Sequence, residues 1–283
     1  MERQRYGELR QTATDRREGE TMMRTILTAL AATALMTTGP VPTGAGAATV
    51  TPASKHAAKD TQRAVAKALA DSARADQQGD DARRKAAEVL AFSGVGPGDE
   101  VLDFLPGSGY WTRIFSGIVG KTGHVYAVWP AAGAKYAEKA IPALEAKHMA
   151  NTSLTVMSGP AIRASEPVDL FWTVQNYHDV NNEPGGEAVL DGFNRQAFAA
   201  LKPGGTYIVI DHADAAGSGM TGTSTRHRID PAAVKAQVVK AGFVFEAESD
   251  ALRNPADDHS AAVFDPAIRG KTDQFVFRFR KPR

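Results

Sequence analysis

Two short polar segments carry the residues that are best suited to acid–base chemistry. The segment QNYHD at 175–179 follows one apolar run, and the pair Asp211-His212 closes another. Histidine titrates near neutral pH, so His178 with Asp179 is suited to removing a proton from a substrate hydroxyl or amine. Polar loop residues also satisfy backbone groups, which is the alternative explanation for both segments. The candidate catalytic residues are Tyr177, His178 and Asp179, with Asp211 and His212 as a second acid–base pair.

The same segments contain donor atoms that suit a divalent metal ion. Imidazole nitrogens and carboxylate oxygens are available from His178, Asp179, Asp211 and His212. Four residues of these types arise easily by chance in such positions, so we expect no metal site. The remaining histidines have no spacing that implies metal ligation; they are His56, His124, His148, His227 and His259.

A different kind of site is indicated by glycines that follow an apolar run. Residues 103–110 read DFLPGSGY, and a helix is expected directly after them. Because Gly107 and Gly109 lack side chains, a ligand can approach the main chain and the N-terminus of that helix. A tight turn between a strand and a helix also requires glycine, so the motif alone leaves both interpretations open.

Apolar runs and helical periodicity alternate along the chain after residue 60. Strands are expected at 100–105, 124–129, 153–157, 168–174, 206–211, 243–247 and 274–280. Helices are expected at 61–78, 80–92, 110–119, 135–149, 187–201 and 231–241. Asp80 or Asp81 should cap the second helix, Gly94 should end it, and Asp230 should cap the last helix.

This alternation predicts an α/β fold of the Rossmann-like, doubly wound type, with helices on both faces of a mostly parallel sheet. The run VLDFL at 101–105 fits a strand that is buried on both sides. No helix separates the last two strands, so one of them should be antiparallel. Ligands bind such sheets beyond the carboxyl ends of the strands, where the strand order reverses. The glycine bend and the polar segments are therefore expected on the same side of the sheet.

Two motifs carry a resemblance to a known family. The pattern V-L-D-x-x-x-G-x-G at 101–109 and the sequence LKPGGT at 201–206 resemble those of class I S-adenosylmethionine-dependent methyltransferases. The resemblance implies about seven strands with the last antiparallel, S-adenosylmethionine as cofactor, and methyl transfer to a small molecule. The cofactor-binding residues that it implies are Asp103, Leu105, Pro106, Gly107, Ser108, Gly109, Trp129 and Asn176.

The chain departs from the family pattern at three places. Leu105 stands where the first glycine of the family's loop belongs, and Trp129 replaces the acidic residue that holds the ribose. Indole donates one hydrogen bond and accepts none, so Trp129 cannot replace that carboxylate. Residues 158–160 (SGP) replace an acid near the adenine. These departures favour the alternative of a non-catalytic extracytoplasmic binding protein with the same fold. A nicotinamide dehydrogenase fits less well, because Thr112 stands where its third glycine would be.

Composition excludes several functional classes. The 283 residues are 43% hydrophobic and 23% charged, with a net charge of +1, which is typical of a globular protein and not of a nucleic-acid-binding one. The absence of cysteine excludes disulfides, thiolate metal sites and cysteine nucleophiles. The expected partner is a small-molecule substrate.

The N-terminal region resembles an export signal that follows a non-native leader. Residues 1–21 are polar and lack periodicity, which suggests that synthesis starts at Met22 or Met23. Residues 22–47 combine a basic start, an apolar run and an A-x-A site, as in a secretory signal, and the run is too short to span a bilayer. We expect a mobile linker at 48–59, a methyltransferase-like domain at 60–283 and an extracytoplasmic location, or a cytoplasmic one if the signal is unused. Because S-adenosylmethionine is made in the cytosol, export leaves its supply unexplained.

Overall fold

The computed structural model describes residues 52–159 and 161–283. The expected leader, signal segment and cleavage site lie outside the described residues. The first helix, α1 (Pro52–Leu69), begins within the segment expected to be a linker. Residues 52–59 contain three alanines and two lysines, which favour helix.

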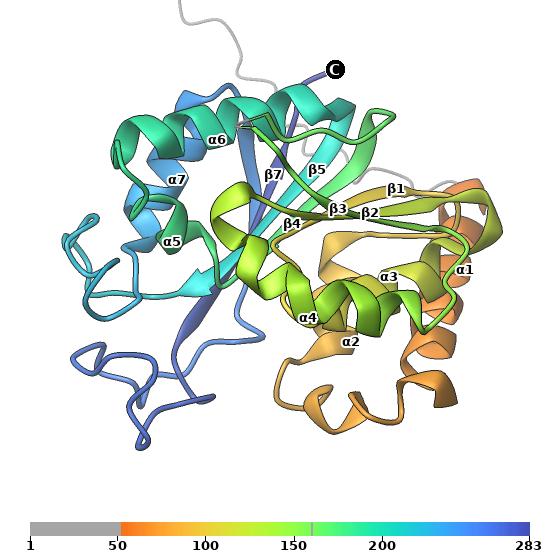
Figure 1. Ribbon diagram of the computed structural model, residues 1–283, viewed down its shortest axis with the longest axis horizontal. Coiled ribbons are helices and arrows are strands. Elements are labelled where there is room, and N and C mark those ends of the chain that lie inside the picture. The colour runs from red at the N-terminus through yellow and green to blue at the C-terminus, as the bar shows by residue number, and fades with distance from the viewer. Residues whose placement is uncertain (1–51, 160) are drawn as a thin grey trace, which may run out of the picture. The chain divides into compact units, whose positions relative to one another are not determined.

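One seven-stranded sheet forms the centre of the fold (Figure 1). Its strands are β1 (Glu100–Phe104), β2 (His124–Trp129), β3 (Thr152–Val156), β4 (Val168–Val174), β5 (Leu201–His212), β6 (Val244–Ser249) and β7 (Gln274–Arg280). The spatial order is β3-β2-β1-β4-β5-β7-β6. Strands β1 to β5 run parallel, and β7 is antiparallel to both of its neighbours. The predicted fold class and the antiparallel last strand are confirmed.

Helices cover both faces of this sheet because successive side chains of each strand point in opposite directions. In β5, Ile208 and Ile210 pack with residues of α1, α2 (Ala86–Ser93) and α3 (Tyr110–Val119). The alternate residues Tyr207 and Val209 pack with α6 (Glu187–Ala200) and α7 (Pro231–Lys240) on the other face. The remaining helices are α4 (Ala134–Glu145), beside β2 and β3, and the short α5 (Tyr177–Val180).

Helix ends follow the expected signals in two cases and differ in one. The Asp230 carboxylate accepts a hydrogen bond from the N–H of Ala232 and caps α7, and Gly94 ends α2 with a φ of 77°. The expected cap at Asp80 or Asp81 is wrong, because α2 begins at Ala86. Lys85, the residue before α2, has a left-handed backbone with a φ of 48°, so the turn at Asp80 and Asp81 does not continue into the helix, and both aspartates pair with arginines.

Two long loops close the end of the sheet at which β5 terminates. Residues 213–230 connect β5 to α7, and residues 250–273 connect β6 to β7. A bidentate ion pair joins them: the Arg228 guanidinium lies 2.8 and 3.0 Å from the two carboxylate oxygens of Asp257. Both side chains are buried. This pair therefore fixes the position of the residues next to it in each loop.

Within the described part of the chain, none of the helices combines the length and the apolar composition needed to cross a membrane.

Candidate functional site

The bend between β1 and α3 has the backbone conformation of a glycine-rich loop, although its first position is not glycine. Leu105, Gly107 and Gly109 have φ values of 52°, 58° and 79°. A left-handed conformation costs a non-glycine residue about 1–2 kcal/mol, and the following proline adds to the restriction at Leu105. The chain thus holds a left-handed conformation at Leu105 at an energetic cost.

Contacts from other segments hold this bend in place. The Asn176 side-chain amide donates hydrogen bonds to the carbonyl oxygens of Phe104 and Leu105, at 3.4 and 3.2 Å. The Leu105 side chain packs so closely against Gly133 that an added Cβ there would lie 2.6 Å from its Cδ1 atom. Asn176 comes from the end of β4, so β4 helps to shape the loop that follows β1.

A cavity of about 190 Å³ lies along this bend, at the carboxyl ends of β1 and β4. The parallel strand order reverses between these two strands, which is where ligands bind in open α/β sheets. At Gly107 an added Cβ would have no atom within 4 Å. The backbone of Gly107 is therefore accessible from the open space beside it. The predicted residues that line the cavity are Asp103, Leu105, Pro106, Gly107, Ser108 and Asn176.

Two predicted cofactor-binding residues do not line this cavity. Gly109 is packed against the side chain of Leu144 in α4, which leaves no room for a side chain at that position. Trp129 is 0% exposed and packs with Ala137, Ala140 and Leu144. In this structure Trp129 is a core residue at the corner between β2 and α4.

Asp103 is a buried carboxyl group at the end of β1. The Thr112 hydroxyl donates a hydrogen bond to it at 2.7 Å, and the residue is 2% exposed. Burial raises the pKa of Asp103 to about 7, and the hydrogen bonds from Thr112 only partly oppose this shift. The protonation of Asp103 therefore changes near neutral pH.

Replacement of this residue, Asp103→Asn, should remove a pH dependence of stability. The folded-state pKa is above the unfolded value of 3.8, so the stabilisation is complete below about pH 4 and is lost as pH rises through about 7. Between pH 5 and 8 the free energy of unfolding should fall on the order of 2 kcal/mol more in the wild type than in the variant. Urea unfolding at several pH values measures this difference, and parallel pH profiles would contradict it.

The segment between α1 and α2 supplies a wall of the cavity that the sequence did not indicate. Arg84 and Tyr110 both line it, and the Arg84 guanidinium lies 4.5 Å from the centre of the Tyr110 ring. The Tyr110 hydroxyl donates to Asp81 at 2.6 Å, which ties this segment to the start of α3. Within the described residues Arg84 has no ion-pair partner, and its Nε atom is buried without a hydrogen bond. Its positive charge is therefore available to a ligand.

The predicted catalytic residues occupy α5, directly after Asn176, and their surroundings differ. Tyr177 is 0% exposed; its hydroxyl accepts a hydrogen bond from Asn194, and burial raises its pKa. The His178 ring is buried, with Nδ1 2.8 Å from Asp211 Oδ1 and Nε2 3.3 Å from Asp179 Oδ1. Burial lowers the pKa of His178, but the two carboxylates outweigh it and raise the pKa to about 10. Without a further ligand His178 is thus protonated at neutral pH, which does not suit a general base.

Asp211 and His212 support this region from the end of β5. Asp211 accepts hydrogen bonds from the backbone N–H groups of His178 and His212, both at 2.8 Å. The His212 ring bonds to the Thr272 hydroxyl instead of joining His178, and burial lowers its pKa to about 4. Asp211 and His212, the second acid–base pair predicted from the sequence, therefore do not act on each other's side chain. The Asp211 carboxylate contacts His178, and the His212 ring contacts Thr272 in the loop at 250–273.

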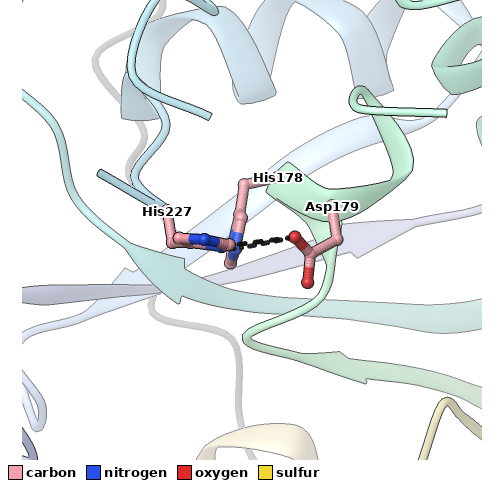
Figure 2. A group of neighbouring side chains, drawn as sticks. All are labelled: His178, Asp179 and His227. Atoms are coloured by element: carbon pink, nitrogen blue, oxygen red, sulfur yellow. Dashed lines mark hydrogen bonds and ion pairs between the residues drawn. The ribbon is translucent and has the colours of Figure 1, made fainter. Parts of the chain in front are cut away.

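His227 completes the cluster, as Figure 2 shows. Its Nδ1 atom lies 3.3 Å from His178 Nε2 and 3.5 Å from Asp179 Oδ1. It comes from the loop at 213–230, far from α5 in the sequence, so its spacing along the chain did not indicate that it lies beside His178. Arg226 and Arg228, on either side of it, form ion pairs that hold this position in place.

Comparison with known proteins reveals likeness at the level of structure. No family model and no curated protein sequence matches the chain. An S-adenosylmethionine-dependent methyltransferase from Aquifex aeolicus is 16% identical, with a TM-score of 0.50 over 78% of this chain and 98% of its own. A structure from the complex of the Haloferax volcanii Trm112 activator with a putative methyltransferase is 16% identical. Its TM-score is 0.52 over 78% of this chain and 98% of its own.

The chain has the class I methyltransferase fold. A further structure with this fold, the [4+2]-cyclase SpnF, has a TM-score of 0.54 at 15% identity over 79% of this chain and 93% of its own. Since a cyclase shares the fold, the fold alone does not fix the reaction. The chemistry must be argued from the site.

Proposed function

We propose that this protein binds S-adenosylmethionine in the cavity between β1 and β4 and transfers its methyl group to a small molecule. The observation that carries the proposal is the bend at 105–109, which keeps the left-handed loop conformation at the point where the strand order reverses. Leu105 holds this conformation although a leucine is strained there.

The residues around the cavity fit the amino-acid end of the cofactor. The bare backbone at Gly107 leaves space beside the bend, and the free guanidinium of Arg84 suits a carboxylate. Asn176 maintains the bend through its two hydrogen bonds to the loop carbonyls. Bound there, S-adenosylmethionine would supply an electrophilic methyl group on a sulfonium centre.

The structure offers fewer binding groups to the ribose end of the cofactor than to its amino-acid end. Trp129 fills the corner where the family pattern has an acid, and it offers no acceptor for the two ribose hydroxyls. Leu105 also occupies space beside Gly133 at the bottom of the bend. The cavity of about 190 Å³ is below the roughly 300–1,000 Å³ of typical small-molecule sites. We therefore infer that most of the affinity comes from the amino-acid end and that the cavity widens when the cofactor binds.

Calorimetry of the full chain with S-adenosylmethionine tests the proposal. We expect heat from one bound molecule per chain, and no heat at millimolar cofactor would reject it. Incubation with mixtures of small hydroxyl and amine compounds should then give products heavier by one methyl group. Binding without transfer to any acceptor in such a screen would instead favour the non-catalytic binding protein.

A further inference from the structure

We propose that His178, Asp179 and His227 bind a divalent metal ion of the zinc type. The three potential ligand atoms form a triangle with sides of 3.3, 3.3 and 3.5 Å. Ligand atoms about 2.0–2.1 Å from a tetrahedral zinc ion are about 3.3–3.4 Å apart, so the triangle matches one face of that tetrahedron. Figure 2 shows the side chains pointing toward one another. This metal site is independent of the proposed methyl transfer.

Asp211 orients the first of these ligands. Its carboxylate lies 2.8 Å from His178 Nδ1, and it also accepts the backbone N–H of His178. With Nδ1 as the donor to this carboxylate, the lone pair of Nε2 is directed into the triangle. A carboxylate behind a histidine ligand is the usual support of a metal-bound imidazole, because it fixes the ring and makes it more basic.

His227 is held in place by the residues on either side of it. Arg226 pairs with the buried carboxylate of Asp214 at 2.7 Å, and Arg228 makes the buried pair with Asp257. The His227 backbone is left-handed, with a φ of 56°. Such conformations persist where the surroundings enforce them, and they are common at ligand sites. The loop is thus built to present this ring to α5.

The donor set and the exposure indicate which ion fits. Two imidazoles and one carboxylate are typical of zinc and of non-haem iron, and three protein ligands leave a position open for water or a substrate. His178 is buried, while the side chains of His227 and Asp179 are 31% and 46% exposed. The ion can therefore enter from the side of these two residues.

A metal-free explanation of the same geometry also exists. A doubly protonated His178 could donate to Asp211 through Nδ1 and to Asp179 through Nε2. His227 could then donate from Nδ1 to Asp179, at 3.5 Å, but without a lone pair directed into the triangle it would not bind an ion. The two explanations therefore differ in whether the chain binds Zn²⁺ and whether replacement of His227 weakens that binding.

Equilibrium dialysis of the full chain against Zn²⁺, followed by elemental analysis, tests the site. The variants are His227→Asn and Asp179→Asn, and the matched control is His148→Asn. His148 is exposed and has a φ of 53°, so the control makes the same change in the same backbone conformation. Asparagine tolerates the left-handed region, which protects the fold in both.

We expect one Zn²⁺ per chain in the wild type and in His148→Asn. Each ligand variant should raise the dissociation constant at least tenfold, by comparison with the ~10–100-fold effect of losing an outer-shell partner. Co²⁺ in place of Zn²⁺ should give the strong visible absorption of a tetrahedral site, which His227→Asn removes. Failure of the wild type to bind at micromolar Zn²⁺, or equal affinity in wild type and His227→Asn, would overturn the proposal.

Discussion

Gly107→Val should abolish binding of S-adenosylmethionine and leave the protein folded. An added Cβ at Gly107 meets no atom of the protein within 4 Å, so the valine side chain would project into open space beside the bend. That space is where we place the cofactor, and two extra methyl groups would block its approach to the backbone. Calorimetry should detect no binding at concentrations that saturate the wild type.

The control for this prediction is Gly217→Val. Gly217 also has a left-handed backbone, with a φ of 82°, and it also has no atom within 4 Å of an added Cβ. Both variants therefore carry a similar backbone cost of about 1–2 kcal/mol, and they differ in whether the site is blocked. Gly217→Val should bind the cofactor as the wild type does. Unchanged affinity in Gly107→Val would remove the bend from the proposed site.

Arg228→Ala should strongly destabilise the folded protein. The arginine is 0% exposed and bonds to both oxygens of Asp257, and also to the carbonyl oxygens of Ala213 and Ala261. Its removal leaves a buried carboxylate without its partner, which costs about 3–5 kcal/mol. Chemical denaturation measures this as a fall in the free energy of unfolding.

Arg63→Ala is the matched control for the ion pair. Arg63 lies 3.5 Å from Asp60 in an exposed pair, with side chains 82% and 63% accessible. Exposed pairs contribute about 0–1 kcal/mol, so this variant should unfold almost as the wild type does. If Arg228→Ala were equally mild, the ion pair would not be what holds the loops at 213–230 and 250–273 together.

The sheet could be predicted from the sequence because the pattern of apolar residues in each strand indicates which of its faces are buried. Runs of apolar residues such as 168–174 mark strands covered on both sides, and the missing helix before β7 indicated its antiparallel direction. Local helix signals worked at Asp230, where Oδ1 caps α7 while Oδ2 accepts backbone N–H groups of the preceding loop. They failed at Asp80 and Asp81, because the left-handed backbone of Lys85 separates that turn from α2.

The site was predictable only as far as it is local in sequence. The bend at 103–110 and the segment at 175–179 follow strand ends, so their side of the sheet could be expected. The approach of His227 to His178 depends on how a long loop folds back, which no spacing along the chain encodes. The burial of Trp129 depends on the packing of α4, and the Arg84 wall depends on a segment with little periodicity.

The contribution of Arg84 also bears on how this protein can be shortened. The segment ahead of α2 belongs to none of the seven strands, yet it is tied to α3 through Tyr110 and through the pair between Arg113 and Asp76. A truncated chain that starts at Ala86 would retain every strand and would lose one side of the cavity. Any minimal domain intended to keep a complete ligand pocket must therefore begin upstream of Asp76.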